Sequence, residues 1–174
     1  MWDATAALRT SSLPVRWVPE GSLHVTLRFL GEVADARAPE IGSALGAAVR
    51  GARTFAVGLG GVGAFPSLGR PRVVWLGVER HPALELLAND VERALAPLGF
   101  EPELRPFAPH LTLGRARHSA GGAAFRGLAR LAERVDHQGT TVVSSVDLMQ
   151  STLGPGGAEY TVVSRAALGA EEGA

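Results

Sequence analysis

The sequence predicts an α+β protein of two lobes, in which two antiparallel sheets are related by a pseudo-twofold axis and carry helices on their outer faces. Three observations predict this fold. A chain of 174 residues with 46% hydrophobic residues is long enough to bury a sizeable core. Segments that alternate like strands are interspersed with segments of helical periodicity. A set of residues also recurs at an offset of 86 positions. We therefore expect residues 1–174 to form a single bilobal domain.

The clearest strand signal lies at residues 23–30, where apolar and polar side chains alternate. This period of two is typical of a half-buried strand. The predicted polar face carries His24, Thr26 and Arg28. The same alternation returns at residues 110–113, where His110 and Thr112 lie opposite two leucines.

The other elements follow from helical periodicity, alternation and turn residues. Helices are predicted at residues 36–50, 83–96 and 122–135, and a short helical stretch ends near residue 9. Further strands are predicted at residues 54–59, 72–78, 140–148 and 159–164, the last after a turn at residues 154–157. Pro66, Gly69 and Pro71 predict a loop between the first two of these strands.

The internal repeat aligns the two motifs at residues 24–27 and 110–113. The offset of 86 carries His24 to His110 and Thr26 to Thr112, and it also superposes predicted helices and strands in the same order. Moved back by 86 positions, the strand predicted at residues 72–78 would fall before residue 1, so it has no counterpart in that direction. We therefore expect the fold to lack its first strand.

Composition excludes several classes of chemistry. All 17 basic residues are arginine, so lysine-dependent Schiff bases, P-loops and adenylylation are excluded. Cysteine is absent, which excludes thiol catalysis and thiolate metal sites. The 17 acidic residues balance the charge. The N-terminus has no basic stretch followed by an apolar run, and the longest apolar run, at residues 55–65, is too short to span a membrane. We expect a cytoplasmic monomer that does not bind membranes.

The two His-x-Thr motifs favour chemistry on a phosphate group. Residues i and i+2 of a strand project from one face, about 6 to 7 Å apart, so an imidazole and a hydroxyl can contact the same anion. Two opposed imidazoles suit in-line displacement, because one removes a proton from the nucleophile while the other protonates the leaving oxygen. Neither motif contains a carboxylate and no His-Glu-x-x-His sequence occurs. We therefore expect neither a metal nor a cofactor.

Other candidate sites carry weaker signals. The glycine run at residues 58–63 matches a dinucleotide fingerprint, but prolines follow where that fingerprint needs a helix, so we interpret it as a strand and turn. Arg115 and Arg117 follow the second motif and are suited to bind phosphate, although solvated side chains at a strand end are nearly as common. Phe107 and Trp75 are candidates for base stacking or for core packing.

The two motifs resemble the paired H-x-T-x signatures of the two-histidine phosphoesterase superfamily. Four longer stretches look like the bacterial and archaeal RNA 2′,3′-cyclic phosphodiesterases, historically called 2′-5′ RNA ligases. They are WVPEGSLHVTLRFLGEV from Trp17, RPRVVWLGV from Arg70, PFAPHLTLGR from Pro106 and STLGPGGAEYT from Ser151. The resemblance covers nearly the whole chain and implies the bilobal fold of that superfamily. It departs at the start, where family members usually have a short apolar strand before the first helix.

The resemblance also implies an activity, which is metal-independent opening of a 2′,3′-cyclic phosphate at an RNA end to a 2′-phosphate, with weak reverse ligation. At the matching positions it makes His24 the proton donor to the leaving 3′-oxygen and His110 the base that activates water. Thr26 and Thr112 then hold phosphate oxygens, and Arg115 is a candidate to contact the substrate. The expected partner is RNA with a cyclic phosphate end.

Two alternatives stay open at this stage. One is a cyclic phosphodiesterase for a small nucleotide such as an ADP-ribose cyclic phosphate. The other is a module that binds RNA ends without turnover. The presence of both histidines and both threonines favours an enzyme.

Overall fold

The computed structural model describes residues 5–118, 120–135, 138–154 and 157–170. The chain forms two compact units, and each takes three segments of the sequence. The first unit contains Met1–Thr26, Gly58–Glu79 and Pro109–Thr141. The second unit contains Leu27–Val57, Arg80–Ala108 and Val142–Ala174.

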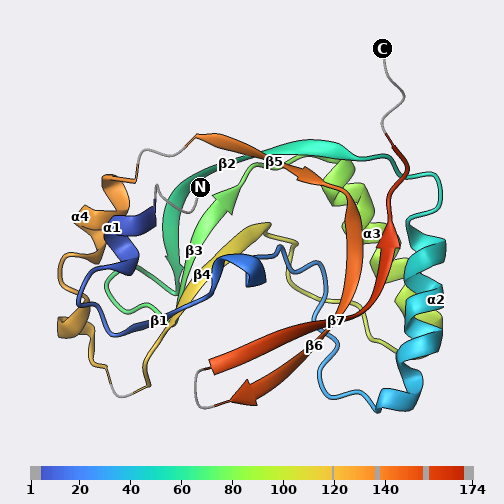
Figure 1. Ribbon diagram of the computed structural model, residues 1–174, viewed down its shortest axis with the longest axis horizontal. Coiled ribbons are helices and arrows are strands. Elements are labelled where there is room, and N and C mark those ends of the chain that lie inside the picture. The colour runs from blue at the N-terminus through green and yellow to red at the C-terminus, as the bar shows by residue number, and fades with distance from the viewer. Residues whose placement is uncertain (1–4, 119, 136–137, 155–156, 171–174) are drawn as a thin grey trace. The chain divides into compact units, whose positions relative to one another are not determined.

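A five-stranded sheet, most of which belongs to the first unit, has the strand order β1-β4-β3-β2-β5 (Figure 1). β4 pairs antiparallel with β1 and β3, and β3 pairs antiparallel with β2. The strands are β1 (Val15–Trp17), β2 (Phe55–Phe65), β3 (Val73–Val78), β4 (His110–Ala116) and β5 (Gly139–Val143).

One face of this sheet is buried and the other is open. On β3, the buried residues Val74, Leu76 and Val78 alternate with half-buried Val73, Trp75 and Gly77. Leu111 and Leu113 of β4 belong to the buried face, and His110 and Thr112 belong to the other, which we call the open face. In the same unit, α1 (Ala6–Arg9) packs against α4 (Leu128–Glu133), where Leu8 and Leu128 are fully buried.

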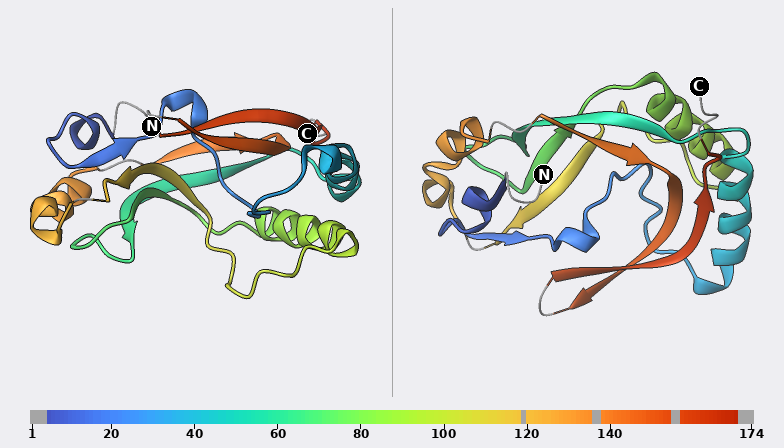
Figure 2. Two further views of the ribbon diagram at one scale, coloured as in Figure 1. Left: turned by 90° about the horizontal axis from the view of Figure 1, so that it is seen from below. Right: turned by 45° about the horizontal axis from the view of Figure 1, so that its top comes forward.

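The second unit contains two helices and a long hairpin of β6 (Ser145–Gly154) and β7 (Gly157–Ala167). α2 (Ala38–Ala48) packs against α3 (Pro82–Leu95) and against β7, as Figure 2 shows from two further directions. Their apolar faces form the core, whose buried residues are Ile41, Leu45, Val49, Leu87, Val91, Leu95, Val146 and Leu168. Burial of these faces stabilises helices that would be marginal on their own.

Most of the elements predicted from the sequence are confirmed. The helices at residues 36–50 and 83–96 correspond to α2 and α3, and the strands at residues 72–78, 110–113 and 159–164 fall within or on β3, β4 and β7. The glycine run at residues 58–63 lies inside β2, which extends the predicted strand to residue 65. The predicted turn at residues 154–157 falls partly outside the described residues.

Three predictions of elements were wrong. Residues 23–30 form no regular strand, because only Val25 makes a bridge to a neighbouring strand. Gly127, with φ +103°, divides the predicted helix at residues 122–135 into a 3-10 turn and α4. The predicted strand at residues 140–148 is interrupted at Ser144 and is divided between β5 and β6.

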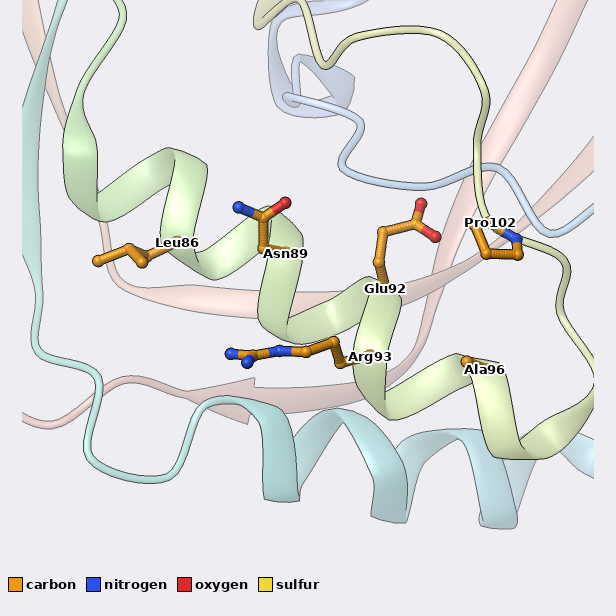
Figure 3. Close-up of a pocket in the computed structure, with 6 residues that line it drawn as sticks. All are labelled: Leu86, Asn89, Glu92, Arg93, Ala96 and Pro102. Atoms are coloured by element: carbon orange, nitrogen blue, oxygen red, sulfur yellow. The ribbon is translucent and has the colours of Figure 1, made fainter.

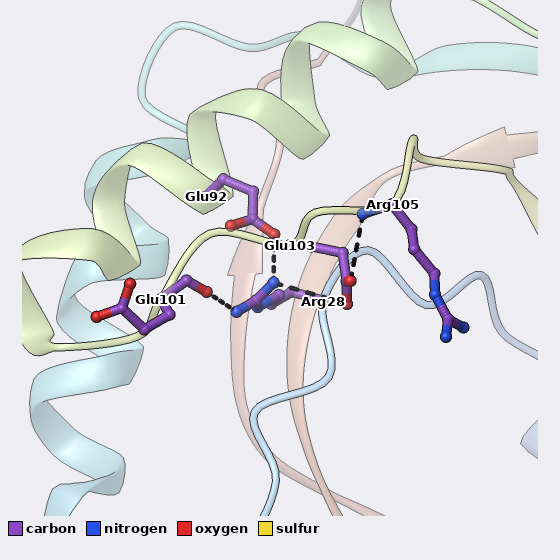
Figure 4. A network of polar contacts seen from close by, with 5 residues as sticks. All are labelled: Arg28, Glu92, Glu101, Glu103 and Arg105. Carbon is purple, nitrogen blue, oxygen red and sulfur yellow. Dashed lines mark hydrogen bonds and ion pairs between the residues drawn. The ribbon is translucent and has the colours of Figure 1, made fainter.

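The alternation at residues 23–30 also fails in its second half. Phe29, predicted on the buried face, is 76% exposed. Arg28, predicted beside His24 and Thr26, instead forms ion pairs with Glu92 at 3.1 Å and Glu103 at 3.9 Å, and it donates to the Glu101 carbonyl (Figure 4). A short strand pattern does not specify side-chain directions where the backbone has no ladder to hold its pleat.

Across the described residues, we find no helix that combines the length and the apolar character needed to cross a membrane.

Candidate active site

The two His-x-Thr motifs meet in the first unit through a single pair of residues. Val25 forms an isolated antiparallel bridge with Leu111 of β4. Antiparallel register then places His24 opposite Thr112, and Thr26 opposite His110. Because neighbours of a bridged pair project to the other face, all four polar side chains lie on the open face of the sheet. The two histidines occupy diagonal positions of this square.

The four side chains differ in exposure. His24, His110 and Thr112 are half-buried, whereas Thr26 is exposed. Between the motifs, Leu111 is 5% exposed and anchors β4 in the core. The polar groups are therefore accessible to a ligand while the backbone that carries them is fixed.

His24 is oriented by its own chain. Its Nδ1 lies 2.8 Å from the carbonyl oxygen of Ser22, the last residue of the 3-10 turn Glu20–Ser22. A carbonyl only accepts hydrogen bonds, so Nδ1 is the donor. In the neutral ring this fixes the tautomer and makes Nε2 the acceptor, and on protonation Nε2 becomes a donor.

His110 is held by aromatic rings on the same face. The ring of Phe65 meets it edge-on at a centroid distance of 5.1 Å and an interplanar angle of 83°. The ring centroid of Trp75 lies 6.3 Å from that of His110 and 5.3 Å from that of Phe65. Edge-to-face packing of this kind restricts the rotation of an imidazole. β2, β3 and β4 each contribute one ring to this cluster.

Two glycines make room for this arrangement. A Cβ on Gly63 would lie 2.2 Å from the Trp75 ring, so the indole packs directly over the β2 backbone. Gly77 is the register partner of His110, and a Cβ there would lie 2.4 Å from the Gly60 carbonyl oxygen. A side chain at Gly63 would displace Trp75, which contacts His110, and one at Gly77 would push apart β2 and β3 beside His110.

Arg115 lies within β4, on the open face, rather than beyond the end of the strand. Its register partners are Arg16 on β1 and Val73 on β3, and Val73 in turn pairs with Phe65 on β2. Sequence analysis missed Arg16 and Phe65. The alternation around Arg16 spans three residues, which is too short to predict a strand, and nothing local to Phe65 places it beside His110.

The remaining candidates fall elsewhere. Arg117 follows β4, and its backbone N–H donates to Pro14. Trp75 is half-buried, and its Nε1 is buried with no hydrogen-bond partner in the described part of the chain, which favours packing over base stacking for this ring. Phe107 is half-buried and belongs to the second unit.

A separate pocket lies in the second unit, along α3 (Figure 3). Pro102 faces the helix there, and none of the motif residues contributes to the lining, which consists of Leu86, Asn89, Glu92, Arg93, Ala96 and Pro102. Within the described residues, no group of three His, Asp or Glu side chains is placed to hold a metal ion.

Comparisons with known proteins match almost the whole chain. Residues 1–154 match the family model described as 2′-5′ RNA ligase superfamily. An Aeropyrum pernix protein named RNA 2′,3′-cyclic phosphodiesterase is 42% identical over 144 residues, which cover 82% of this chain and 80% of that protein. A Methanothermobacter thermautotrophicus protein of the same name is 33% identical over 154 residues, which cover 88% of this chain and 83% of that protein.

Solved structures share the fold. A crystal structure of a Thermus thermophilus protein covers 98% of this chain and 91% of its own, with a TM-score of 0.78 and 28% identity. The match to Escherichia coli LigT complexed with 3′-AMP covers 93% of this chain and 86% of LigT, with a TM-score of 0.66 and 29% identity.

Proposed function

Because the chain belongs to the 2′-5′ RNA ligase superfamily, we propose that it hydrolyses 2′,3′-cyclic phosphate ends of RNA to 2′-phosphate ends. The observation that supports this proposal is the bridge between Val25 and Leu111, which sets the two His-x-Thr motifs side by side in antiparallel register. In this proposal the two motifs form one site.

The reaction is an in-line displacement at phosphorus. His110 takes a proton from water, the water oxygen attacks, and the bond from phosphorus to the 3′-oxygen breaks. His24 gives a proton to the departing 3′-oxygen, which leaves a free 3′-hydroxyl and a 2′-phosphate. The hydrogen bond from Nδ1 of His24 to Ser22 directs its Nε2 to this task. Thr26 and Thr112 donate hydrogen bonds to the nonbridging oxygens, where charge develops.

The same geometry supports ligation. A 5′-hydroxyl of a second RNA can replace water as the nucleophile, and displacement of the 3′-oxygen then gives a 2′-5′ linkage. His110 and His24 keep their roles because the bonds formed and broken at phosphorus are equivalent. Hydrolysis dominates where water is in excess over RNA ends.

Product analysis tests this function. We expect the purified chain to convert an oligoribonucleotide with a 2′,3′-cyclic phosphate end to the 2′-phosphate, as identified by phosphorus NMR. Formation of the 3′-phosphate would reverse the assigned leaving group. Failure to open the ring, in a sample that melts cooperatively, would favour the RNA-end binding module instead. A monomeric state and a cytoplasmic location are further predictions, checked by light scattering and by localisation of the tagged protein.

A further inference from the structure

Positive charge is concentrated on the unit that contains the motifs. The segments of the first unit hold nine arginines against five acidic residues, whereas those of the second hold eight against twelve. Arginines of the second unit pair with its acidic residues, as in Arg28–Glu92, Arg80–Glu85 and Arg165–Asp147. Although the chain as a whole has no net charge, the unit that carries both motifs has an excess of positive charge.

Two of these arginines are direct neighbours. Arg16 of β1 and Arg115 of β4 are register partners, and both are exposed. Neither side chain forms an ion pair or hydrogen bond with the described part of the chain. Like charges directly opposite each other on a sheet are destabilising unless an anion lies between them. Two guanidinium groups, each with a planar fork of N–H donors, suit the two nonbridging oxygens of a phosphodiester.

Their position relates them to the catalytic residues. The alternation of β4 is interrupted by two consecutive buried residues, Leu113 and Gly114, beside a register shift. This irregularity returns Arg115 to the open face, on the same side as His110 and Thr112. On β3, the partners of Thr112 and Arg115 are Trp75 and Val73, which are two residues apart. The arginine pair thus lies about 7 Å along the sheet from the threonine.

We propose that Arg16 and Arg115 form a second phosphate-binding subsite, which takes the phosphodiester on the 5′ side of the terminal nucleotide. This inference rests on the proposed function, because it assumes that His24 and His110 bind the cyclic phosphate. An RNA end carries this neighbouring phosphodiester and a nucleoside cyclic monophosphate does not. The subsite therefore makes the enzyme prefer polynucleotide ends, and contacts to the backbone do so without reading sequence.

The test compares two substrates in one enzyme. The kcat/KM value is measured for a tetraribonucleotide with a 2′,3′-cyclic phosphate end and for cytidine 2′,3′-cyclic monophosphate. In the double variant Arg16→Gln/Arg115→Gln, we expect the ratio of the two values to fall by about 10- to 100-fold, mainly through KM of the tetranucleotide. The dependence of that KM on salt should also weaken.

Two further variants distinguish binding at this subsite from nonspecific attraction of RNA to positive charge. Arg130→Gln/Arg134→Gln removes the same charge from α4 and its C-terminal cap in the same unit, and should leave the ratio as in the unsubstituted enzyme. Arg16→Lys/Arg115→Lys keeps the charge but loses the planar forks, and should give an intermediate ratio. Thermal melting confirms that each variant is folded.

The outcomes are distinguishable. A ratio unchanged in the glutamine variant, or lowered equally by the α4 variant, overturns the subsite and leaves the proposed function intact. Absence of turnover of both substrates by the unsubstituted enzyme overturns the proposed function itself.

Discussion

Val25 and Leu111 form an isolated antiparallel bridge, and this one pairing decides where the polar groups of both motifs lie. A strand pattern by itself places His24 beside Thr26, and His110 beside Thr112. The bridge adds the cross-strand relation, so that each histidine faces the threonine of the other motif. The proposed phosphate site therefore draws on both motifs.

We expect His24→Ala and His110→Ala each to reduce kcat by about 10² to 10⁴, because each removes one proton transfer of a single displacement. The double variant should be scarcely worse than either single one, since the two residues act as a unit. Single-turnover kinetics measures this. Near-normal turnover in either single variant would contradict the assignment, and His118→Ala, on an exposed side chain outside the motifs, is the control.

Gly63→Ala should disturb the site through Trp75. The new Cβ would lie 2.2 Å from the indole, and relief of such an overlap costs roughly 1 to 3 kcal/mol and moves the ring away from its contacts with His110. We expect a lower Tm, a changed tryptophan fluorescence and a reduced kcat.

Gly46→Ala is the matched control for that change. Gly46 lies inside α2, and a Cβ there meets nothing within 4 Å. Alanine favours a helix over glycine by about 0.5 to 1 kcal/mol, so this variant should melt higher with kcat unchanged. A lower Tm in Gly46→Ala, or an unchanged kcat in Gly63→Ala, would contradict these expectations.

Asp147 should make stability depend on acid. The two carboxylate oxygens of Asp147 accept hydrogen bonds from Nε and Nη2 of Arg165 at 2.9 and 2.7 Å. These bonds lower the pKa of the Asp147 carboxyl, although burial opposes them. A lowered folded-state pKa gives stability that is present above the unfolded pKa of about 3.9 and is lost as pH falls through the folded value.

Thermal melting of Asp147→Asn checks this dependence. At neutral pH we expect a lower Tm than in the unsubstituted protein, and the difference should shrink as pH falls below about 4. Glu32→Gln, on an exposed side chain, should show no such convergence. A Tm difference that is constant from pH 7 to pH 3 would rule out the ion pair as its cause.

Activity should survive exhaustive chelation. The proposed proton transfers use His24 and His110, and Thr26 and Thr112 supply the donors for phosphate oxygens, so the reaction as written needs no metal ligand. The measurement is kcat after treatment with EDTA and gel filtration into metal-free buffer. Loss of activity that Zn²⁺ or Mn²⁺ restores would show that a metal takes part.

Local patterns in the sequence were enough to predict the residues of the proposed site and several elements of the fold. The sequence predicted that His24 shares a face with Thr26, and His110 with Thr112, because side chains two apart on an extended chain point the same way. The same local rules predicted α2, α3 and β3. They failed at Arg28 and Phe29, where no ladder holds the pleat and tertiary packing sets the side-chain directions.

Contacts between residues distant in sequence follow from the pairing of the strands and could not be predicted locally. Strand register brought Arg16 opposite Arg115 and Phe65 against His110. Register depends on backbone hydrogen bonds between segments far apart in the chain and on the irregularity at Leu113 and Gly114. Neither leaves a periodic signal in the sequence around Arg16 or Phe65, because a strand of three residues and a single exposed ring have no pattern of their own.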